Sequence, residues 1–181
     1  MKYKAISFRQ TKSCHKFQCE AISGCKYYIG IDPDVDKNGF AVVSSAGCVI
    51  DIGCLPFAEL IDYIVLFVIS HSDVLVCIEG GWLNRTNWHT NGASIAMAAR
   101  IGNAAGRNHQ TGILLNEVLV YRGIRTKVVK PLRKCWSGQD RKITHQEIVK
   151  ITHINRKTTN QEERDALLLA WVNAGLPLRI T

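Results

Sequence analysis

The strongest constraint on the fold is a run of three short, β-branched segments with almost no chain between them. Three segments have the composition of strands: Lys26–Ile31, Gly39–Ser44 and Cys48–Leu55. Turns are expected between them, at the sequences DVDKNG and SAG. Turns this short imply antiparallel neighbours, because a parallel connection needs a much longer crossover. The sequence therefore predicts a three-stranded antiparallel meander.

Helices and strands alternate in the remainder of the chain. A helix is expected over PFAELIDYIVLFVISH, which opens with Pro56 at its first position, and DVLVCIE has the pattern of a strand that is apolar on both faces. Four further elements are expected after this strand: a long helix over residues 93–121, a strand at RTKVVK, a short helix over 144–152 and a last helix over 161–174. The predicted fold class is α/β: a mixed five-stranded sheet of three antiparallel and then two parallel strands, joined by right-handed crossovers, with helices on both faces.

Length and composition suit a single domain. The chain has 181 residues, of which 46% are apolar, enough to bury a core. Residues 1–25 are predicted to form a basic, flexible N-terminal leader, and residues 26–181 the folded domain. No apolar run approaches the roughly 18 residues of a membrane span, and the start MKYKAISFRQ lacks the apolar stretch of a signal peptide. We therefore expect a cytoplasmic protein with no membrane partner.

The seven cysteines, an odd number, argue against a disulfide framework. Cys48, Cys54 and Cys77 lie in apolar segments, where a reduced thiol behaves as a small hydrophobic side chain. Reduced thiols are therefore expected, and a zinc site in the leader is not, because its C-x4-C-x5-C spacing is not that of a usual zinc knuckle. The residues concerned are Cys14, His15, Cys19 and Cys25.

The positive charge is concentrated in one part of the chain. The formal net charge is +8, and between Arg122 and Lys157 eleven Lys and Arg residues stand against two acids, Asp140 and Glu147. Such a block can be merely a solvated face, but in a folded basic domain it favours a polyanionic partner. Nucleic acid is the first candidate.

Two acidic residues end strands that the predicted topology places side by side. Asp32 ends the first strand and Glu79 the fourth, and both strands run in the same direction, so their ends should meet. Two carboxylates held together repel and raise each other's pKa unless a cation lies between them. A divalent cation bound through oxygen is the simplest remedy. Asp32 can instead begin the turn at Pro33, and Glu79 can simply terminate its strand.

The last helix adds two further acids. Glu162 and Asp165 are three residues apart and share one helix face. Four carboxylates from three elements are what a two-metal phosphodiester site requires. Two alternatives stay open, since Thr159 and Glu162 have the spacing of a capping box and Glu163 competes with Glu162 for the fourth position. Asp34 and Asp36 are interpreted as turn residues.

Five motifs of the chain are, in order, IGIDPDVDKNGFAVV, VLVCIEG, AARIGNAAG, KVVKP and EERDALLLA. In this order and spacing they resemble the RuvC-type Holliday junction resolvases of the ribonuclease H-like superfamily. The resemblance runs from about Tyr27 to Val172. It implies a ribonuclease H-like fold, a homodimer and two Mg²⁺ or Mn²⁺ ions per active site. It also implies symmetric nicking of branched DNA, a four-way junction, with 5′-phosphate and 3′-hydroxyl ends. The residues that match the metal-binding and catalytic positions of the family are Asp32, Glu79, Glu162 and Asp165.

The chain also departs from this family. Asp34 stands where the family usually has glycine, and Glu162 where it has aspartate. The loop after Glu79 carries two tryptophans that are predicted either to stack on a DNA base or to pack on their own domain. The predicted DNA-binding residues are Trp82, Arg85, Trp88, Lys130, Arg133, Lys134, Arg141 and Lys142. Lys142 is also a candidate for stabilising charge during catalysis, whereas His145 and His153 are expected to be surface or packing residues.

Two questions remain open at the level of sequence. The alanine- and glycine-rich first half of the long helix is a candidate dimer interface, because two symmetric cuts need two sites in a fixed two-fold relation; the same small residues can instead pack on the sheet. The function can be junction resolution, but a catalytically silent branched-DNA-binding protein and a ribonuclease H-like nuclease with another substrate share the same fold. A sugar-kinase or actin-like ATPase needs two such domains, for which 181 residues leave no room.

Overall fold

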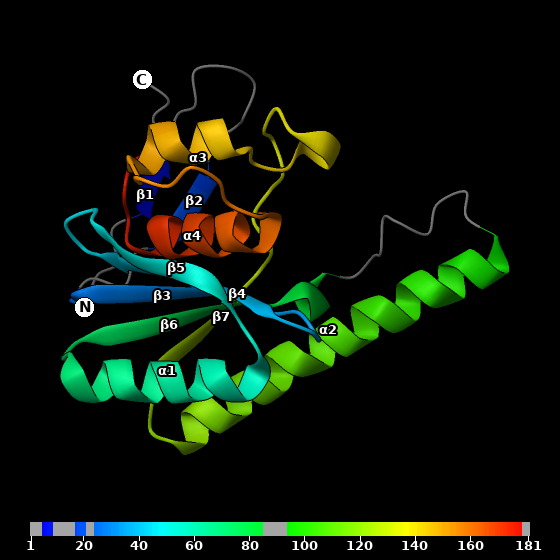
Figure 1. The fold of residues 1–181 in the computed structure, drawn as a ribbon, viewed down its shortest axis with the longest axis horizontal. Coiled ribbons are helices and arrows are strands. Elements are labelled where there is room, and N and C mark those ends of the chain that lie inside the picture. The colour runs from blue at the N-terminus through cyan, green and yellow to red at the C-terminus, as the bar shows by residue number, and fades with distance from the viewer. Residues whose placement is uncertain (1–4, 9–16, 21–23, 85–93, 179–181) are drawn as a thin grey trace.

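The computed structural model describes residues 5–8, 17–20, 24–84 and 94–178 (Figure 1). Its central element is a five-stranded sheet in the order β5-β4-β3-β6-β7. The strands are β3 (Tyr27–Asp32), β4 (Asn38–Ser44), β5 (Val49–Leu55), β6 (Val74–Glu79) and β7 (Thr126–Val129). The helices are α1 (Phe57–Ser70), α2 (Ile95–Tyr121), α3 (His145–Thr152) and α4 (Gln161–Asn173), with 3-10 turns η1 (Gly81–Leu83) and η3 (Gln139–Arg141).

The pairing of the strands confirms the topology predicted from the sequence. β3 pairs antiparallel with β4, and β4 pairs antiparallel with β5, whereas β6 runs parallel to both β3 and β7. The predicted fold class is therefore correct, with three antiparallel strands followed by two parallel ones. Predicted and observed strand ends differ by a residue or two, as between Lys26–Ile31 and the observed β3.

Helices cover both faces of the sheet, α3 and α4 on one side and α1 and α2 on the other (Figure 1). Each face has its own core, and β3 contributes to both because alternate residues of a strand point to opposite faces. Tyr28 packs in the α4 core, and Ile29 and Ile31 in the core with α1 and α2. By the same alternation Asp32 belongs to the α4 face.

Glycines at two strand positions let α4 lie directly on the sheet. A Cβ at Gly30 would collide with the carbonyl oxygen of Ala166 and would stand 2.7 Å from the backbone nitrogen of Ala170. A Cβ at Gly39 would collide with the backbone of Glu162. Glycine inside a strand often marks such a close backbone approach. This contact brings the N-terminal end of α4 over the end of β3, where Asp32 lies.

The two halves of α2 have different surroundings. Its C-terminal half packs on the sheet and buries Gly112, Leu115 and Leu119, whereas its N-terminal half extends away from the sheet (Figure 1). Ile95 is 92% exposed, and apart from the neighbouring backbone of α2 itself no atom of the described residues lies within 4 Å of a Cβ built at Gly102. The alternative that these small residues pack on the sheet is therefore wrong. Among the described helices, none has the length and apolar character needed to cross a membrane.

Part of the predicted leader forms strands. β1 (Ala5–Phe8) and β2 (Phe17–Glu20) pair antiparallel in a separate two-stranded sheet. In the described residues, Cys25, Cys48, Cys54 and Cys77 form no disulfide. Cys135 is disulfide-bonded, so the expectation of reduced thiols is wrong for this residue. Cys14 and His15, from the possible zinc group, lie outside the described residues.

Candidate active site

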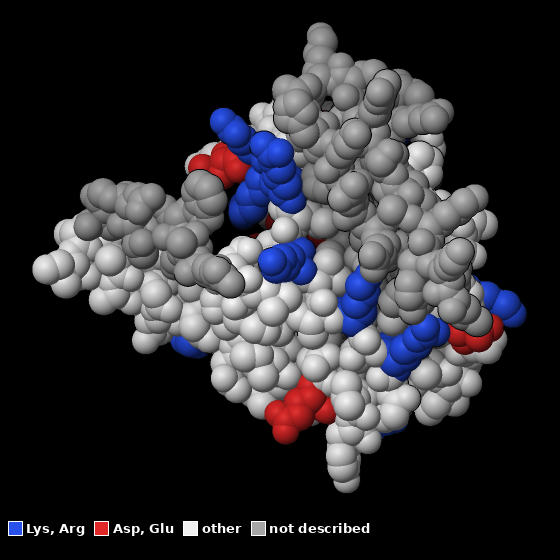
Figure 2. All heavy atoms as spheres, turned by 180° about the vertical axis from the view of Figure 1, so that it is seen from behind, with Lys and Arg blue, Asp and Glu red and all other residues white. Residues whose placement is uncertain are grey.

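A cavity of about 270 Å³ opens where β3 and β6 end. Its lining includes all four acids singled out in the sequence, Asp32, Glu79, Glu162 and Asp165. Figure 2 shows a hollow in this region of the surface, with Lys and Arg side chains around it and acidic atoms deep inside. The structure thus brings together, in one cavity, acids that are up to 133 positions apart in the chain (Asp32 and Asp165).

Asp32 and Glu79 meet because their strands are parallel neighbours in register. Ile31 pairs with Ile78, so the next residue on each strand is an acid, and both side chains point to the α4 face. Burial, the negative charge of Glu79 and those of Asp165 and Glu162 hold the pKa of Asp32 well above its ordinary range. Burial, and next the charge of Asp165, raise the pKa of Glu79 to about 7. Burial and mutual repulsion therefore favour the protonated forms of Asp32 and Glu79.

The start of α4 decides which glutamate faces the cavity. Asn160 is the N-cap, and its side chain accepts a hydrogen bond from Glu163 N (2.8 Å), while the Glu163 carboxylate accepts one from Asn160 N (2.9 Å). The capping box is therefore Asn160 with Glu163, and the alternative of Thr159 with Glu162 is wrong. Glu163 is committed to the cap, and Glu162 lines the cavity.

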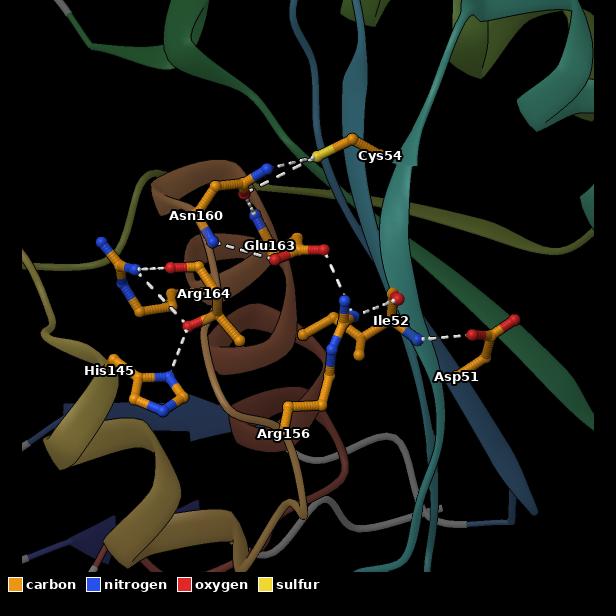
Figure 3. A network of polar contacts seen from close by, with 9 residues as sticks. Asp51, Ile52, Cys54, His145, Arg156, Asn160, Glu163 and Arg164 are labelled. Atoms are coloured by element: carbon orange, nitrogen blue, oxygen red, sulfur yellow. Dashed lines mark hydrogen bonds and ion pairs between the residues drawn. The ribbon is translucent and has the colours of Figure 1, made fainter.

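Arg156 fastens this cap to the sheet (Figure 3). Its guanidinium forms an ion pair with Glu163 (3.3 Å) and donates a hydrogen bond to the carbonyl oxygen of Ile52 on β5 (2.8 Å). Glu163 is 8% exposed, so the pair is largely shielded from water on its acidic side. Two residues after Ile52 on β5, the Cys54 thiol contacts the Asn160 amide (Nδ2 to Sγ, 3.2 Å). These contacts fix the rotation of α4, and with it the direction of Glu162 and Asp165.

Two lysines face the carboxylates. Lys142 and Lys134 both line the cavity. The positive charge of Lys142 opposes the rise in the pKa of Asp32, and both lysines oppose the rise in the pKa of Glu79 and Asp165. Lys134 was predicted from the sequence to bind DNA only. Its closeness to the acids follows from the fold of the segment after β7, which no local sequence pattern reveals.

The loop that carries Lys142 is tightly folded. Trp136 is buried, and backbone hydrogen bonds join Trp136 N to Arg141 O (3.1 Å) and Gly138 N to Lys142 O (3.0 Å). Asp140 and Arg141 both adopt left-handed backbone conformations, with φ of 53° and 58°. Residues held in this region usually depend on the surrounding structure. The loop therefore presents Lys142 from a defined position rather than from a flexible segment.

Apart from Trp82, the other predicted DNA-binding residues divide into three groups. Arg133 lines the cavity, and Lys130 and Arg141 are exposed outside its lining. In the described ranges, the ion pairs are Lys26 with Asp73 and Arg156 with Glu163, so no acid forms an ion pair with the segment 130–142. This segment is available to an anionic partner. Arg85 and Trp88 lie outside the described residues.

Trp82 packs within its own domain. A Cβ at Gly112 of α2 would stand 2.6 Å from the Trp82 ring, and His109 contacts the ring edge-on at a centroid distance of 6.4 Å. Of the two alternatives for this side chain, packing is therefore what the structure shows. Neither His145 nor His153 lines the cavity; His145 Nδ1 lies 3.0 Å from Thr159 Oγ1, and His153 is the exposed C-cap of α3.

The turn after Asp32 is held from two sides. Asp34 accepts hydrogen bonds from Asp36 N (2.9 Å) and from Asn108 Nδ2 of α2 (2.9 Å), and the buried Asn38 accepts one from Asp34 N (3.2 Å). Asp34 is thus a turn residue, as expected, although it also lines the cavity. The role of Asn108 was missed, because nothing local in the sequence links α2 to this turn.

The donor atoms in the cavity suit a hard divalent cation. All four acids supply carboxylate oxygens, the ligands that Mg²⁺ and Mn²⁺ prefer, and burial and mutual repulsion raise the pKa of Asp32. Among the described residues, no group of three or more His, Cys, Asp and Glu side chains already has the arrangement of a metal site. The acids line one cavity without yet converging on one point. The residues fit divalent ions by their chemistry and their common location.

Comparison with known proteins supports the fold through structure alone. No family model matches the sequence, and no curated protein matches it. A structure of Thermus thermophilus RuvC in complex with a Holliday junction substrate has a TM-score of 0.51 and 12% identity, covering 80% of this chain and 89% of that one. A second Thermus thermophilus RuvC structure has a TM-score of 0.51 and 11% identity, covering 83% and 97%. The chain has the fold of RuvC, the ribonuclease H-like fold expected from its sequence.

Proposed function

We propose that the protein is a metal-dependent endonuclease that resolves four-way DNA junctions by nicking two symmetric strands. The observation that carries this proposal is that Asp32, Glu79, Glu162 and Asp165 line one cavity beside the basic segment 130–142, on the fold of RuvC. An acidic cavity bordered by cations matches a phosphodiester bound through divalent ions, because the cations attract the phosphates and the acids hold the metal.

In this proposal the four acids hold two Mg²⁺ or Mn²⁺ ions. When bound, such ions lower the pKa of a ligated water and offset the charge of the phosphate. Hydrolysis adds the water oxygen to the phosphorus and releases the O3′ oxygen, which gives 5′-phosphate and 3′-hydroxyl ends. Lys142, held by its rigid loop, faces the acids and stabilises the negative charge that develops on the phosphate. Lys134, which also lines the cavity, contributes to the same stabilisation.

The basic residues outside the cavity position the DNA. Arg133 borders the cavity, and Lys130 and Arg141 are exposed, so they can bind phosphates of the strand that leaves the site. Contacts of this kind orient the backbone without reading base sequence. Binding should therefore weaken steeply as salt concentration rises, because phosphate contacts release counterions.

The proposal includes a homodimer formed through the projecting half of α2. Ile95 is 92% and Met97 49% exposed, and no atom of the described chain lies within 4 Å of a Cβ at Gly102 or Gly106. Small residues allow a second helix to approach closely, and a two-fold pair provides two sites in a fixed relation. Analytical ultracentrifugation should show a dimer. A monomer that still makes paired cuts would remove this part of the proposal.

The decisive experiment compares cleavage of a four-way junction, a flap, duplex DNA and an RNA-DNA hybrid in Mg²⁺ and in Mn²⁺. The wild type should nick the junction in preference to the others. Asp32→Asn should lower the nicking rate at least about 1,000-fold while junction binding is kept or tightened, because a carboxylate that repels phosphate is lost. The matched control is Asp36→Asn, in the same turn but exposed, which should nick normally.

Each other outcome selects a different reading. Junction binding without cleavage by the wild type, in either metal, would identify a catalytically silent branched-DNA-binding protein. Preferential cleavage of the flap or the hybrid would identify a nuclease with another substrate. If Asp32→Asn fails to fold while Asp36→Asn folds, Asp32 has a structural role instead.

A further inference from the structure

Arg164 of α4 contacts the loop that carries Lys142. Its side chain donates hydrogen bonds from Nε to the carbonyl oxygen of Ile143 (2.9 Å), from Nη1 to the carbonyl and hydroxyl oxygens of Thr159, and from Nη2 to Gln161 Oε1 (2.9 Å). Figure 3 shows the guanidinium directed at the segment before α4. One planar group therefore connects the segment at Ile143 to the start of α4.

The bond from Arg164 fixes the orientation of the Gln161 side-chain amide. A guanidinium only donates, so the amide must present its oxygen to Arg164 and its NH₂ group on the other side. That NH₂ group donates to Asp165 Oδ1 at 2.8 Å. In the part of the chain that the structure describes, Asp165 Oδ2 accepts no hydrogen bond. One oxygen of Asp165 is thus held by Gln161, and the other is left for a ligand in the cavity.

The same guanidinium restrains Lys142. Ile143, whose carbonyl oxygen accepts from Arg164 Nε, directly follows Lys142 in the chain and is 1% exposed. Lys142 and Asp165 both line the cavity, one from the loop after β7 and the other from α4. The Arg164 side chain therefore restrains the backbone next to Lys142 and, through Gln161, the orientation of the Asp165 carboxylate.

We infer that Gln161 and Arg164 are positioning residues of the active site: they orient Asp165 toward bound metal and hold the segment of Lys142 against α4. This inference rests on the proposed function. Partners that hold a metal-binding carboxylate through a hydrogen bond typically contribute a factor of about 10 to 100 in metal affinity or activity. Gln161 is only half-buried at the first position of α4, so its replacement tests this effect with little damage to the fold.

The test uses the full chain and Mn²⁺ alone, with binding followed by electron paramagnetic resonance of the unbound ion. Gln161→Met retains the length and most of the volume of the side chain but cannot donate a hydrogen bond, and Gln161→Ala removes both. Both variants should raise the dissociation constant for Mn²⁺ by about 10-fold or more, with an unchanged unfolding temperature. The control Gln146→Ala, an exposed glutamine on α3, should bind Mn²⁺ like the wild type.

The outcomes separate this inference from the proposed function. If Gln161→Met binds Mn²⁺ as tightly as the wild type, Gln161 only fills space and the positioning role is overturned, while the nuclease proposal stands. If both Gln161 variants lose metal because they unfold, the side chain serves folding and the role is likewise overturned. If the wild type itself binds no Mn²⁺, the proposed function fails and this inference fails with it.

Discussion

The helices α4 and α2 both reach the candidate active site, but the protein holds them very differently. α4 buries nine of its thirteen residues, and its N-terminal cap is tied to β5 through Arg156. α2 buries three of its twenty-seven, all in the half that packs on the sheet. One helix is fixed by its own chain along its whole length. The other is fixed for half its length and projects for the remainder.

The difference shows that the more extensively packed helix is the one that supplies acids to the cavity. The acids of the proposed metal site would have to stay within a narrow range of positions, and α4 supplies two of the four from a helix that contacts the sheet backbone. Within the described part of the chain, residues 95–107 of α2 do not line the cavity, and nothing but the helix's own backbone lies within 4 Å of a Cβ at Gly102 or Gly106. Substitutions of the same chemical kind should therefore have opposite effects on the two helices.

The largest effect is expected at the contact between α4 and the sheet. Gly30→Ala places a methyl group against the backbone of Ala166 and Ala170, which cannot move aside as a flexible side chain can. We expect the free energy of unfolding to fall by more than about 3 kcal/mol, measured by urea denaturation. A variant of wild-type stability would show that α4 can shift on the sheet, and the contrast with α2 would disappear.

The second effect concerns pH in the absence of metal. The pKa of Glu79 is raised from 4.5 to about 7, so between these values the folded protein binds more protons than the unfolded chain. The free energy of unfolding should therefore fall as pH rises from about 4.5 to 7, by up to about 3 kcal/mol, and added Mn²⁺ should restore it at pH 7. Thermal unfolding in chelator measures this change.

Glu79→Gln provides the control for this pH dependence. The amide does not titrate, so the slope between pH 4.5 and 7 should become shallower. An equally steep slope in Glu79→Gln would mean that the dependence does not arise from Glu79, and the pKa of this side chain would not be the cause of the pH effect.

The smallest effect is expected on the projecting half of α2. Gly102→Ala adds a methyl group where no described atom lies within 4 Å, and alanine favours helix over glycine by up to about 1 kcal/mol. Stability should therefore rise slightly or stay unchanged in dilute protein, where self-association is weakest. A concentration-independent loss of stability would show that this half of α2 already packs within one chain.

Most of the architecture could be predicted because it depends on local patterns. The apolar runs and short turns between residues 26 and 55 indicated the meander, and the strand after α1 had the composition of a fully buried one. The approach of Asp32 to Glu79 followed from strand order and polarity. The orientation of α4 could not be predicted in this way, since a shift of one residue rotates a helix by about 100°, and both Glu162 and Glu163 fitted the local pattern.

The sequence by itself determined the order of the elements, the acids at the ends of β3 and β6 and the basic segment beyond β7, because periodicity and turn length are properties of neighbouring residues. Only the tertiary structure decided that Glu163 caps α4, that Trp82 packs on α2, that Lys134 faces the acids and that Gln161 holds Asp165. Each of these depends on a contact between elements distant in the chain or on the rotation of a helix, and such contacts form only when the whole sheet and its two helical layers assemble.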